Sequence, residues 1–524
     1  MKNSLPILVM LSMLALSQGV MATDFTINTD VTTTNGGNTL DGNDSLTITG
    51  SGSIKPGAGV PAVDAIGDNN TVTNFGSISV ADEDAVEVVD NSVVTNTGSI
   101  TAVGYKANGI VADHYNTITN SGSITTSGEK AHAIDVQEYN YILNTGSLST
   151  TGEGADGIHT WDNSTVINTG AISTLDQDSV GIAVEDDSRV TNNGSISTEG
   201  SDGYGIQADG SNNTIINNGS ISTKGDDGYG IFLEGNNNKA TNTGIITTSG
   251  EDAEAVYFDG DNNTIFNTGI IRATGKKADG IAASGSNSTI NNAGLISATG
   301  TDIIYAVSMR DNSTLNLLPG SRIIGPIDLD EAGVDGNDTV NIYGGSPSAQ
   351  MTLTGEDTIN FFGAGIINGE TVTTVDATAP TVQGIASANL SNTVHGTDNQ
   401  RIAYKPQLQP LQVASLVSAP GMLYQERKPV AWVQAFGGQR DYEVNGSVMA
   451  YDHAHYGFNV GYEWDTEERR VGVMAGFARS DIESEITSFD TESDNFFVGG
   501  YGHFNLGSVN LTASLIGGYS DYDN

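Results

Sequence analysis

Short segments with apolar residues at every second position, separated by polar turns, run through most of the chain. The unit at 214–238 contains three such segments, at 214–218, 220–223 and 229–233, with an acidic glycine turn before the last. This period of two predicts β-strands, not helices. Three short strands with a turn after each predict one coil of a parallel β-helix, in which each coil pairs with the next at a spacing of about 4.8 Å.

The same phrase, Asn-x-Gly-x-Ile/Leu, recurs ten times between residues 74 and 296, and its glycines are 22 residues apart once and then 24 or 25 apart. So regular a period indicates identical units stacked on one another. We therefore predict an all-β fold: a right-handed parallel β-helix of roughly 12 coils over residues 23–327. The glycines are Gly76, Gly98, Gly122, Gly146, Gly170, Gly194, Gly219, Gly244, Gly269 and Gly294.

Two columns of aliphatic residues are predicted to fill the interior, burying area that no single coil could bury alone. The first column contains Ile78, Ile100, Ile124, Leu148, Ile172, Ile196, Ile221, Ile246, Ile271 and Ile296. The second column contains Ile66, Val86, Ile110, Ile134, Ile158, Ile182, Ile206, Ile231, Val256, Ile281 and Val307.

An asparagine two places before each repeat glycine is predicted to form a further column. We expect these asparagines at a corner with left-handed backbone angles, bonding from coil to coil, while the glycine lets the chain turn. We favour a ladder whose side chains hydrogen-bond to the backbone of the turns over a ligand site. The asparagines are Asn74, Asn96, Asn120, Asn144, Asn168, Asn192, Asn217, Asn242, Asn267 and Asn292.

Tyrosines and carboxylates on the coils raise two binding hypotheses. Tyr204, Tyr229 and Tyr257 have the chemistry to bind a sugar, although a role in the wall of the rod is favoured. An acidic stripe invites bridging by divalent cations, against the favoured interpretation of a solvated face that keeps the rod soluble. The stripe comprises Asp90, Asp113, Glu138, Asp162, Asp186, Asp209, Glu234 and Asp259.

Charge, cysteine content and the N-terminus indicate an exported protein. The chain has 63 acidic and 20 basic residues, a formal net charge of −43, which argues against a nucleic-acid partner. It has no cysteine, as expected of a chain that crosses a membrane unfolded. Residues 1–22, with Lys2 before an apolar stretch, are predicted to be a signal peptide cleaved between Ala22 and Thr23.

Short catalytic motifs are missing from the sequence. The seven histidines form no His-Glu-x-x-His pair, and no Gly-x-Ser-x-Gly occurs. A Gly-x-Gly-x-x-Gly at 152–157 lies in a coil turn, and the calcium-repeat-like stretches at 41–46 and 333–340 are isolated copies at the ends of the array. We therefore predict no catalytic, cofactor-binding or metal-binding residues and a protein that is not an enzyme.

The repeat ends before a different kind of domain. Residues 328–374 are predicted to be irregular terminal coils or a cap, and 375–430 a proline-punctuated linker with a helix near its start. Residues 431–524 contain five segments with aromatic residues on one face and small or polar residues on the other, which predicts five antiparallel membrane-spanning strands.

This order of parts resembles the classical monomeric autotransporters of Gram-negative bacteria, which use type V secretion. The specific motif is Trp432-x-x-x-Phe436-Gly437-Gly438 and the strands after it. The resemblance implies an outer-membrane β-barrel inserted by the barrel assembly machinery, a linker helix through its pore, and a passenger displayed outside the cell. Because five strands cannot close a barrel, the sequence is expected to be a fragment or an interrupted gene, and not to secrete itself.

The leading functional hypothesis is a non-enzymatic passenger that acts as an adhesin or aggregation factor on an unidentified ligand of a host or neighbouring cell. The alternative is an extracellular hydrolase or lyase acting on polymers, with its site on one face of the β-helix. A third hypothesis is an interrupted gene product without function. The long repetitive surface without a catalytic motif favours the first.

Overall fold

The computed structural model describes 22–302, 304–329, 337–343, 349–354, 358–362, 365–374, 384, 388, 390–394, 396, 429–442, 451–466, 469–484, 490–505 and 509–523. Nearly all of the predicted signal peptide, most of the predicted linker and the stretch at 333–336 lie outside these residues. Ala22 and Thr23, at the predicted cleavage site, are described.

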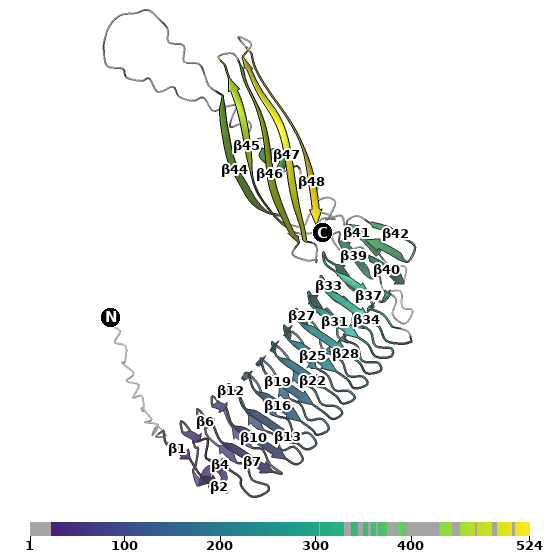
Figure 1. Ribbon diagram of the computed structural model, residues 1–524. Helices are drawn as coiled ribbons and strands as arrows, with labels where there is room; N and C mark the ends of the chain where they lie inside the picture. The colour runs from purple at the N-terminus through teal and green to yellow at the C-terminus, as the bar shows by residue number, and fades with distance from the viewer. Residues whose placement is uncertain are drawn as a thin grey trace, which may run out of the picture. The chain divides into compact units, whose positions relative to one another are not determined.

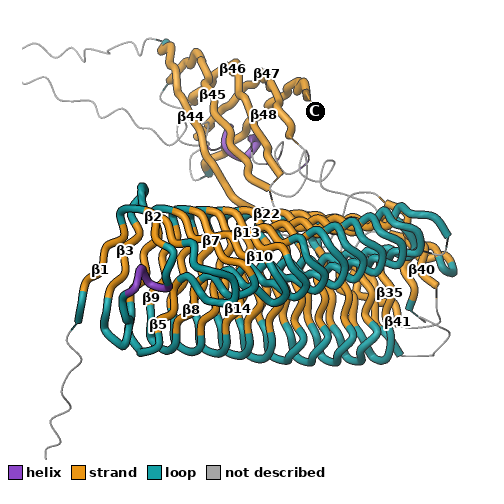
Figure 2. Tube along the Cα trace, turned by 90° about the horizontal axis from the view of Figure 1, so that it is seen from below, coloured by secondary structure: helices purple, strands orange, loops and turns teal. Residues whose placement is uncertain are grey.

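Three sheets of short strands wind into a parallel β-helix, with one strand of each sheet in every repeated coil (Figures 1 and 2). The first sheet contains β1 (Asp24–Ile27), β3 (Ser45–Ile48), β6 (Thr71–Asn74), β9 (Val93–Asn96), β12 (Thr117–Asn120), β15 (Tyr141–Asn144), β18 (Thr165–Asn168), β21 (Arg189–Asn192), β24 (Thr214–Asn217), β27 (Lys239–Asn242), β30 (Thr264–Asn267), β33 (Thr289–Asn292), β36 (Thr314–Leu317), β39 (Thr339–Tyr343) and β41 (Thr358–Phe362).

The second sheet has 13 strands, close to the predicted number of coils. They are β2 (Asp30–Val31), β4 (Ser53–Ile54), β7 (Ser77–Ala81), β10 (Ser99–Val103), β13 (Ser123–Ser127), β16 (Ser147–Thr150), β19 (Ala171–Thr174), β22 (Ser195–Thr198), β25 (Ser220–Thr223), β28 (Ile245–Thr248), β31 (Ile270–Ala273), β34 (Leu295–Ala298) and β37 (Arg322–Ile324). A short 3-10 helix, η1 (Thr34–Gly37), follows β2 in the first coil.

The third sheet is parallel through the coils and ends in antiparallel strands. The parallel strands are β5 (Val63–Ala65), β8 (Val86–Val88), β11 (Ile110–Ala112), β14 (Ile134–Val136), β17 (Ile158–Thr160), β20 (Ile182–Val184), β23 (Ile206–Ala208), β26 (Ile231–Leu233), β29 (Val256–Phe258), β32 (Ile281–Ala283), β35 (Val307–Met309) and β38 (Ile327–Asp328). The final three are β40 (Ala349–Thr354), β42 (Gly365–Asn368) and β43 (Thr371–Thr374), and they interrupt the parallel pairing as a cap would.

Both predicted aliphatic columns are buried, with one error. Every member of the first column and all but the first of the second are at most 1% exposed. Ile66, predicted to begin the second column, is 62% exposed, and Val63 pairs with Val86 in its place. The first sheet adds a third column that was not predicted, represented by Ile118, which is fully buried.

The asparagine column forms the predicted ladder, but its backbone is not left-handed. The amide of Asn120 donates from Nδ2 to Oδ1 of Asn144 at 2.8 Å, and Asn144 donates to Asn168 in the same way. These asparagines end strands of the first sheet, and positive φ occurs instead at turn residues such as Asn212 (φ 63°). The expectation of a left-handed corner is therefore wrong for the ladder, because the strand continues through it.

The repeat glycines are required by close approach between coils. A Cβ on Gly146 would lie 2.0 Å from the carbonyl oxygen of Gly122 in the preceding coil, and Gly170 has the same relation to Gly146. Neither Gly146 nor Gly170 has a positive φ. The glycine therefore makes room for the stacked backbone, and its predicted role in letting the chain turn is wrong.

Five long antiparallel strands form a separate sheet near the C-terminus, as predicted. They are β44 (Val430–Tyr442), β45 (Tyr451–Asp465), β46 (Arg469–Ser484), β47 (Asp490–Asn505) and β48 (Asn510–Asp523). Helical residues of the preceding segment, Leu390 and Val394, pack against Met474, Ala478 and Phe497 of this sheet. Among the described residues, no helix is both long and apolar enough to cross a membrane.

Candidate functional site

The outer surface of the third sheet is the candidate site, and we call it the third-sheet face. Two columns of outward residues define it, because strands in register place equivalent side chains one above another. The first column contains Asp84, Asn108, His132, Asp156, Val180, Tyr204, Tyr229, Glu254, Asp279 and Tyr305. The second contains Asp64, Glu87, Val111, Asp135, His159, Ala183, Gln207, Phe232, Tyr257, Ala282 and Ser308.

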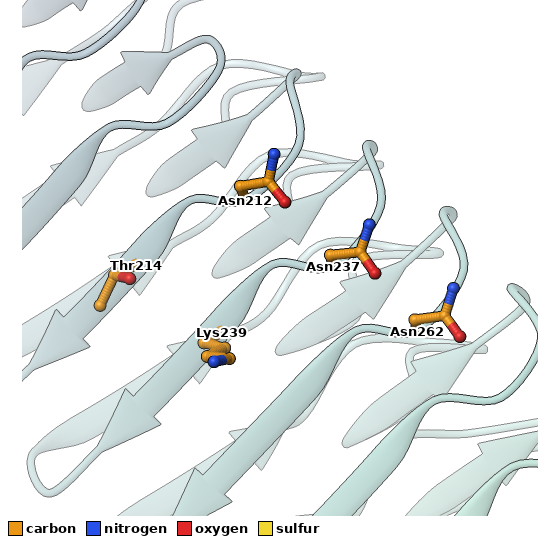
Figure 3. Close-up of a pocket in the computed structure, with 5 residues that line it drawn as sticks. All are labelled: Asn212, Thr214, Asn237, Lys239 and Asn262. Carbon is orange, nitrogen blue, oxygen red and sulfur yellow. The ribbon is translucent and has the colours of Figure 1, made fainter.

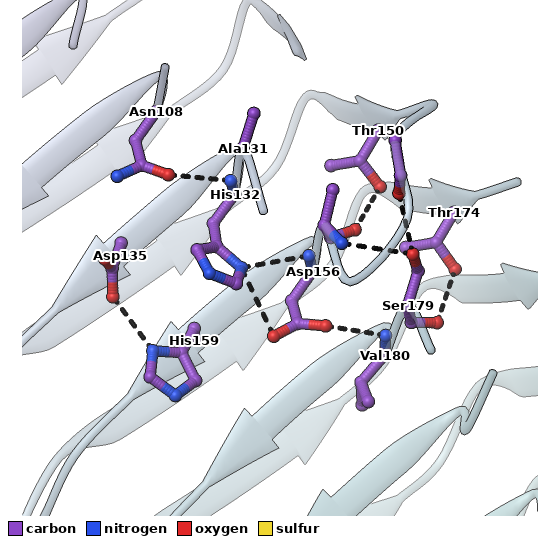
Figure 4. A network of polar contacts seen from close by, with 12 residues as sticks. Asn108, Ala131, His132, Asp135, Thr150, Asp156, His159, Thr174, Ser179 and Val180 are labelled. Carbon is purple, nitrogen blue, oxygen red and sulfur yellow. Dashed lines mark hydrogen bonds and ion pairs between the residues drawn. The ribbon is translucent and has the colours of Figure 1, made fainter. Parts of the chain in front are cut away.

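Two histidines and two aspartates form a polar cluster toward the N-terminal end of the third-sheet face (Figure 4). His159 Nδ1 lies 2.9 Å from Asp135 Oδ1, its register partner in the preceding coil. His132 Nδ1 lies 3.2 Å from Asp156 Oδ2 and 3.0 Å from the backbone nitrogen of Asp156. The two imidazole rings stack with their centroids 5.1 Å apart. We call these four residues the His–Asp cluster.

Ion pairing shifts the pKa values within the His–Asp cluster. Burial alone would raise the pKa of Asp135, but the hydrogen bond from His159 and the neighbouring positive charges lower it. Burial alone would lower the pKa of His159, but the hydrogen bond and charge of Asp135 raise it. The pair is therefore held in its charged form over a wider pH range than either group alone.

Four aromatic residues form a second cluster farther along the same face, which we call the aromatic cluster. Tyr204 and Tyr229 stack with centroids 5.2 Å apart, and Phe232 and Tyr257 stack at 5.4 Å. Tyr229 also meets Phe232 edge to face at 5.3 Å. The two stacked pairs are therefore steeply tilted to each other, with 67° between the ring planes of Tyr229 and Phe232, and do not form one continuous stack.

The tyrosine hydroxyls remain protonated across the physiological pH range. Burial raises the pKa of Tyr204 to about 12, and burial with the charge of Glu254 also raises that of Tyr229. Tyr257 Oη accepts a hydrogen bond from Ser284 Oγ at 3.1 Å. The cluster therefore combines apolar area with neutral hydrogen-bond donors, which is the composition of a surface for polar, uncharged ligands.

Carboxyl groups on the third-sheet face have strongly raised pKa values. Burial, followed by the charges of Asp279 and Asp252, raises the pKa of Glu254 to about 8. Burial and the nearby Asp84 raise that of Glu87 to about 7. At neutral pH Glu254 therefore keeps its proton and is an acid able to donate it.

Asp279, one coil beyond Glu254, has a contrasting environment. Its Oδ1 accepts the backbone N–H of Tyr305 at 2.7 Å, and its Oδ2 accepts Ser308 Oγ–H at 2.7 Å. Both oxygens of Asp279 are therefore engaged by donors of the chain itself. The face holds a protonated carboxyl, Glu254, one coil away from this hydrogen-bonded acidic side chain, on strands about 4.8 Å apart.

The predicted acidic stripe falls in two columns instead of one. Register places Asp90 above His114, whereas Asp113 lies above Gln137 and shares a column with Asp209. Several of these carboxylates bond to the next coil, as when Asp162 Oδ1 accepts the N–H of Asp186 at 3.0 Å. Alternation of the two columns separates charges that the sequence analysis placed in one row.

A shallow polar groove of about 560 Å³ follows the turns after the third sheet (Figure 3). It is lined by Asn212, Asn237 and Asn262, which occupy equivalent left-handed turn positions, together with Thr214 and Lys239. This groove is formed by turn amides and one lysine and contains neither the aromatic cluster nor a carboxyl with a raised pKa. The groove therefore offers fewer groups for binding or catalysis than the third-sheet face.

The stacking of coils brings together site residues that lie too far apart in the sequence to form a short motif. His132 and His159 belong to different coils, and Glu254 and Asp279 are likewise one coil apart. Their shared place in the 24- or 25-residue period was the available signal. The period identified the core columns and the asparagines, and the three tyrosines were predicted as a possible sugar site, but Phe232 and Glu254 were missed.

Two family models match the chain. Residues 15–231 match a family described as the BigA third pectate lyase-like domain, and residues 431–524 match the autotransporter beta-domain. The chain has no match among the curated proteins and none among the solved structures. The first match covers the N-terminal part of the β-helix, including the His–Asp cluster, and the second begins one residue after β44 starts.

The first match corrects the prediction that the protein is not an enzyme. A domain described as pectate lyase-like covers residues 15–231, so the absence of short catalytic motifs is no argument against activity. The physical reason for the error is that a β-helix builds a site from side chains on successive coils. Searches for motifs within one stretch of sequence do not detect such sites.

Architecture and family matches agree on the organisation of the chain. A parallel β-helix precedes five antiparallel strands, and these strands match the autotransporter beta-domain, which implies anchoring in the outer membrane. The β-helix is then the exported passenger. With these features in this order, the chain has the organisation of a classical autotransporter, with a β-helical passenger followed by an autotransporter β-domain.

Proposed function

We propose that the passenger is an adhesin that binds an extended polysaccharide, neutral or bearing amino groups, along the third-sheet face. The observation that carries the proposal is the aromatic cluster beside Glu254. Apolar rings and protonated hydroxyls complement the mixed apolar and hydroxyl surface of a sugar. Display of this face outside the cell would attach the bacterium to surfaces that carry the glycan.

Charge on the face favours this class of polymer. From Asp135 to Ala282, the two columns of the third-sheet face contain no lysine or arginine but include Asp135, Asp156 and Asp279. A polyuronate such as pectate is itself negatively charged and would be repelled by these groups. The proposed ligand therefore differs from the polymer in the description of the matched family.

Repetition of the coils supports binding to a polymer. Equivalent positions recur about every 4.8 Å along the rod, so successive units of an extended chain meet successive coils. Each added contact is intramolecular once the first has formed, which raises the overall affinity without a deep pocket. A shallow face is sufficient for such a ligand.

A second candidate function is hydrolysis of the bound polymer. Glu254 and Asp279 supply a protonated acid and a second carboxyl group on adjacent coils, the pair of groups that glycosidases use. Cleavage by elimination is less favoured. A lyase needs a base and a positive charge that neutralises the substrate carboxylate, and these columns contain no cationic Lys or Arg near Glu254. The pectate lyase-like match also supports action on a polymer.

Binding is tested with the purified full chain on a panel of neutral, amino-bearing and polyuronate polymers. Truncation of both Tyr204 and Tyr229 to alanine should weaken binding to the preferred polymer by about tenfold. The matched control truncates Tyr115 and Tyr139, which stack at 4.9 Å but lie on turns outside the third-sheet face. Preference for polyuronates, or equal losses in both double variants, would contradict the proposal.

Cleavage is tested by following the reducing ends released from the polymers that bind. Glu254→Gln and Asp279→Asn should each abolish hydrolysis while retaining binding, since neither removes the aromatic cluster. Glu153→Gln, at an exposed turn, is the control and should change nothing. Release of unsaturated ends, or activity that survives Glu254→Gln, would rule out this acid.

A further inference from the structure

We propose that His132, Asp135 and His159 form a binding site for a divalent transition-metal ion of the Zn²⁺ class. One ligand atom from each residue lies within 4.8 Å of the other two, so a single ion can reach all three with modest side-chain movement. Two imidazoles and one carboxylate are ligands that Zn²⁺ prefers and that Ca²⁺ and Mg²⁺ do not. This proposal goes beyond the glycan function and is independent of it.

The backbone fixes the positions of the three ligands. Asp135 and His159 are register partners on β14 and β17, so the parallel sheet holds their side chains on adjacent strands of one face. His132 precedes β14 in the coil of Asp135, and its backbone N–H donates to Asn108 Oδ1 at 2.7 Å. Rigid strands that place ligands in advance reduce the entropy lost on binding.

Asp156 is placed to accept a hydrogen bond from the ring nitrogen of His132 that does not bind the metal, as carboxylates commonly do for metal-bound histidines. Its Oδ2 lies 3.2 Å from His132 Nδ1, and its other oxygen accepts the N–H of Val180 at 2.7 Å, which anchors the carboxylate (Figure 4). With Nδ1 engaged by Asp156, Nε2 is the nitrogen of His132 left for a metal. A carboxylate that orients a histidine in this way strengthens it as a ligand.

The two contacts at His132 Nδ1 require opposite protonation states. The backbone N–H of Asp156 donates to an unprotonated Nδ1, which leaves the proton on Nε2, whereas Oδ2 of Asp156 accepts from a protonated Nδ1. A metal at Nε2 selects the second arrangement. Binding therefore switches the tautomer of His132 and exchanges one existing partner for another without moving the backbone.

Three protein ligands leave the ion with an open position. Zn²⁺ holds nitrogen and oxygen ligands at about 2.0 Å, which separates tetrahedral ligands by roughly 3.3 Å. The 2.9 Å pair of His159 and Asp135 needs only slight opening to admit the ion. The exposed fractions of the His159 and Asp135 side chains, 26% and 29%, place the fourth position toward solvent.

The experiment measures metal binding by the full chain in detergent. Zn²⁺ affinity is obtained by competition with a chromophoric chelator, and Co²⁺ is used as a spectroscopic substitute whose visible absorption reports tetrahedral nitrogen and oxygen ligation. We expect one Zn²⁺ per chain at this site, a tetrahedral Co²⁺ spectrum displaced by Zn²⁺, and no displacement by Ca²⁺. The Co²⁺ spectrum of the unmodified chain does not depend on whether any variant folds.

Variants assign the ion to these residues. His132→Gln and His159→Gln should each abolish tight binding, and Asp156→Asn should weaken it by about 10- to 100-fold. His114→Gln is the matched control, because His114 also pairs with an aspartate, Asp90, at 3.0 Å but has no third ligand among the residues that the structure describes. Unchanged affinity in His159→Gln, an octahedral Co²⁺ spectrum or an equal loss in His114→Gln would overturn the proposal.

Discussion

The β-helix and the five-stranded sheet use the same alternation of apolar and polar residues with opposite results. In the β-helix the apolar residues at inward positions, such as Ile118 and Ile134, are fully buried inside the rod. In β45 the apolar members Phe458 and Trp464 are 47% and 46% exposed, while Asn459 and Glu463 are buried. A period of two thus specifies strands, and the solvent around each domain decides which face is buried.

Glycine also serves the two regions differently. In the β-helix, repeat glycines lie against the backbone of the preceding coil, as Gly146 does against Gly122. In the five-stranded sheet several glycines lie against aromatic rings instead: a Cβ on Gly461 would be 2.3 Å from Trp432. The β-helix needs its glycines for backbone stacking, which side-chain rearrangement cannot relieve, whereas a ring can rotate away.

The largest effect is expected from adding side chains at repeat glycines. Gly146→Val should cost about 4 kcal/mol or more, at the upper end for a single substitution, because its Cβ meets a carbonyl that the stacked coils cannot move. Gly517→Ala in β48 is the control, since nothing lies within 4 Å of a Cβ there. Chemical denaturation followed by circular dichroism measures both, and a mild Gly146→Val would refute the stacking requirement.

Breaking the asparagine ladder should have the next largest effect. Asn144→Leu leaves Asn120 Nδ2 and Asn168 Oδ1 buried without their partner, at a cost of about 1–3 kcal/mol each. Asn218→Ala removes a similar amide bond, to Asn193, on the exposed surface and should change stability by less than about 0.5 kcal/mol. Similar denaturation midpoints for the two variants would contradict a special role for burial.

Raising the pH should destabilise the β-helix. The pKa of Glu254 is about 8 in the folded chain against 4.5 ordinarily, so between these values the folded state holds a proton that the unfolded state has released. Stability therefore falls as pH rises through this window, and Glu87, at about 7, adds to the fall. Glu254→Gln should flatten the dependence of melting temperature on pH. Equal slopes for both proteins would refute the raised pKa.

Calcium should have the smallest effect. The acidic residues after the third sheet fall in two columns, and some of them already bond to the next coil, which weakens the repulsion available for a cation to relieve. We expect the β-helix to melt no more than about 2 °C higher in calcium than in chelator. A larger rise would support the bridging hypothesis that the sequence analysis raised.

Residues that repeat in every coil were the most predictable from sequence. The column from Ile78 to Ile296 was identified because every coil has an aliphatic residue at the same position. Ile66 was misplaced because the spacing of the first repeats is irregular, so Val63, three residues earlier, takes the buried position. A period locates a column reliably only where the spacing has become constant.

The roles of Asn, Gly and the site residues were less predictable. Turn propensities suggested that Asn144 and Gly146 form a corner, whereas coil-to-coil contacts determine both positions. The His–Asp cluster and the aromatic cluster appear once each, so no repetition marked them. The coil period places these side chains on adjacent strands, but the sequence does not show which of them pair or stack there.

The asparagine ladder also gives the rod a net dipole along its axis. From Asn74 to Asn267 every bond of the ladder runs the same way, with the Nδ2 of one coil donating to the Oδ1 of the next. Strand dipoles in a sheet largely cancel, but these amide dipoles add head to tail, and each polarises its neighbour. A buried row of aligned amides therefore distinguishes one end of the passenger from the other, and a single substitution within it would divide that row into two shorter dipoles.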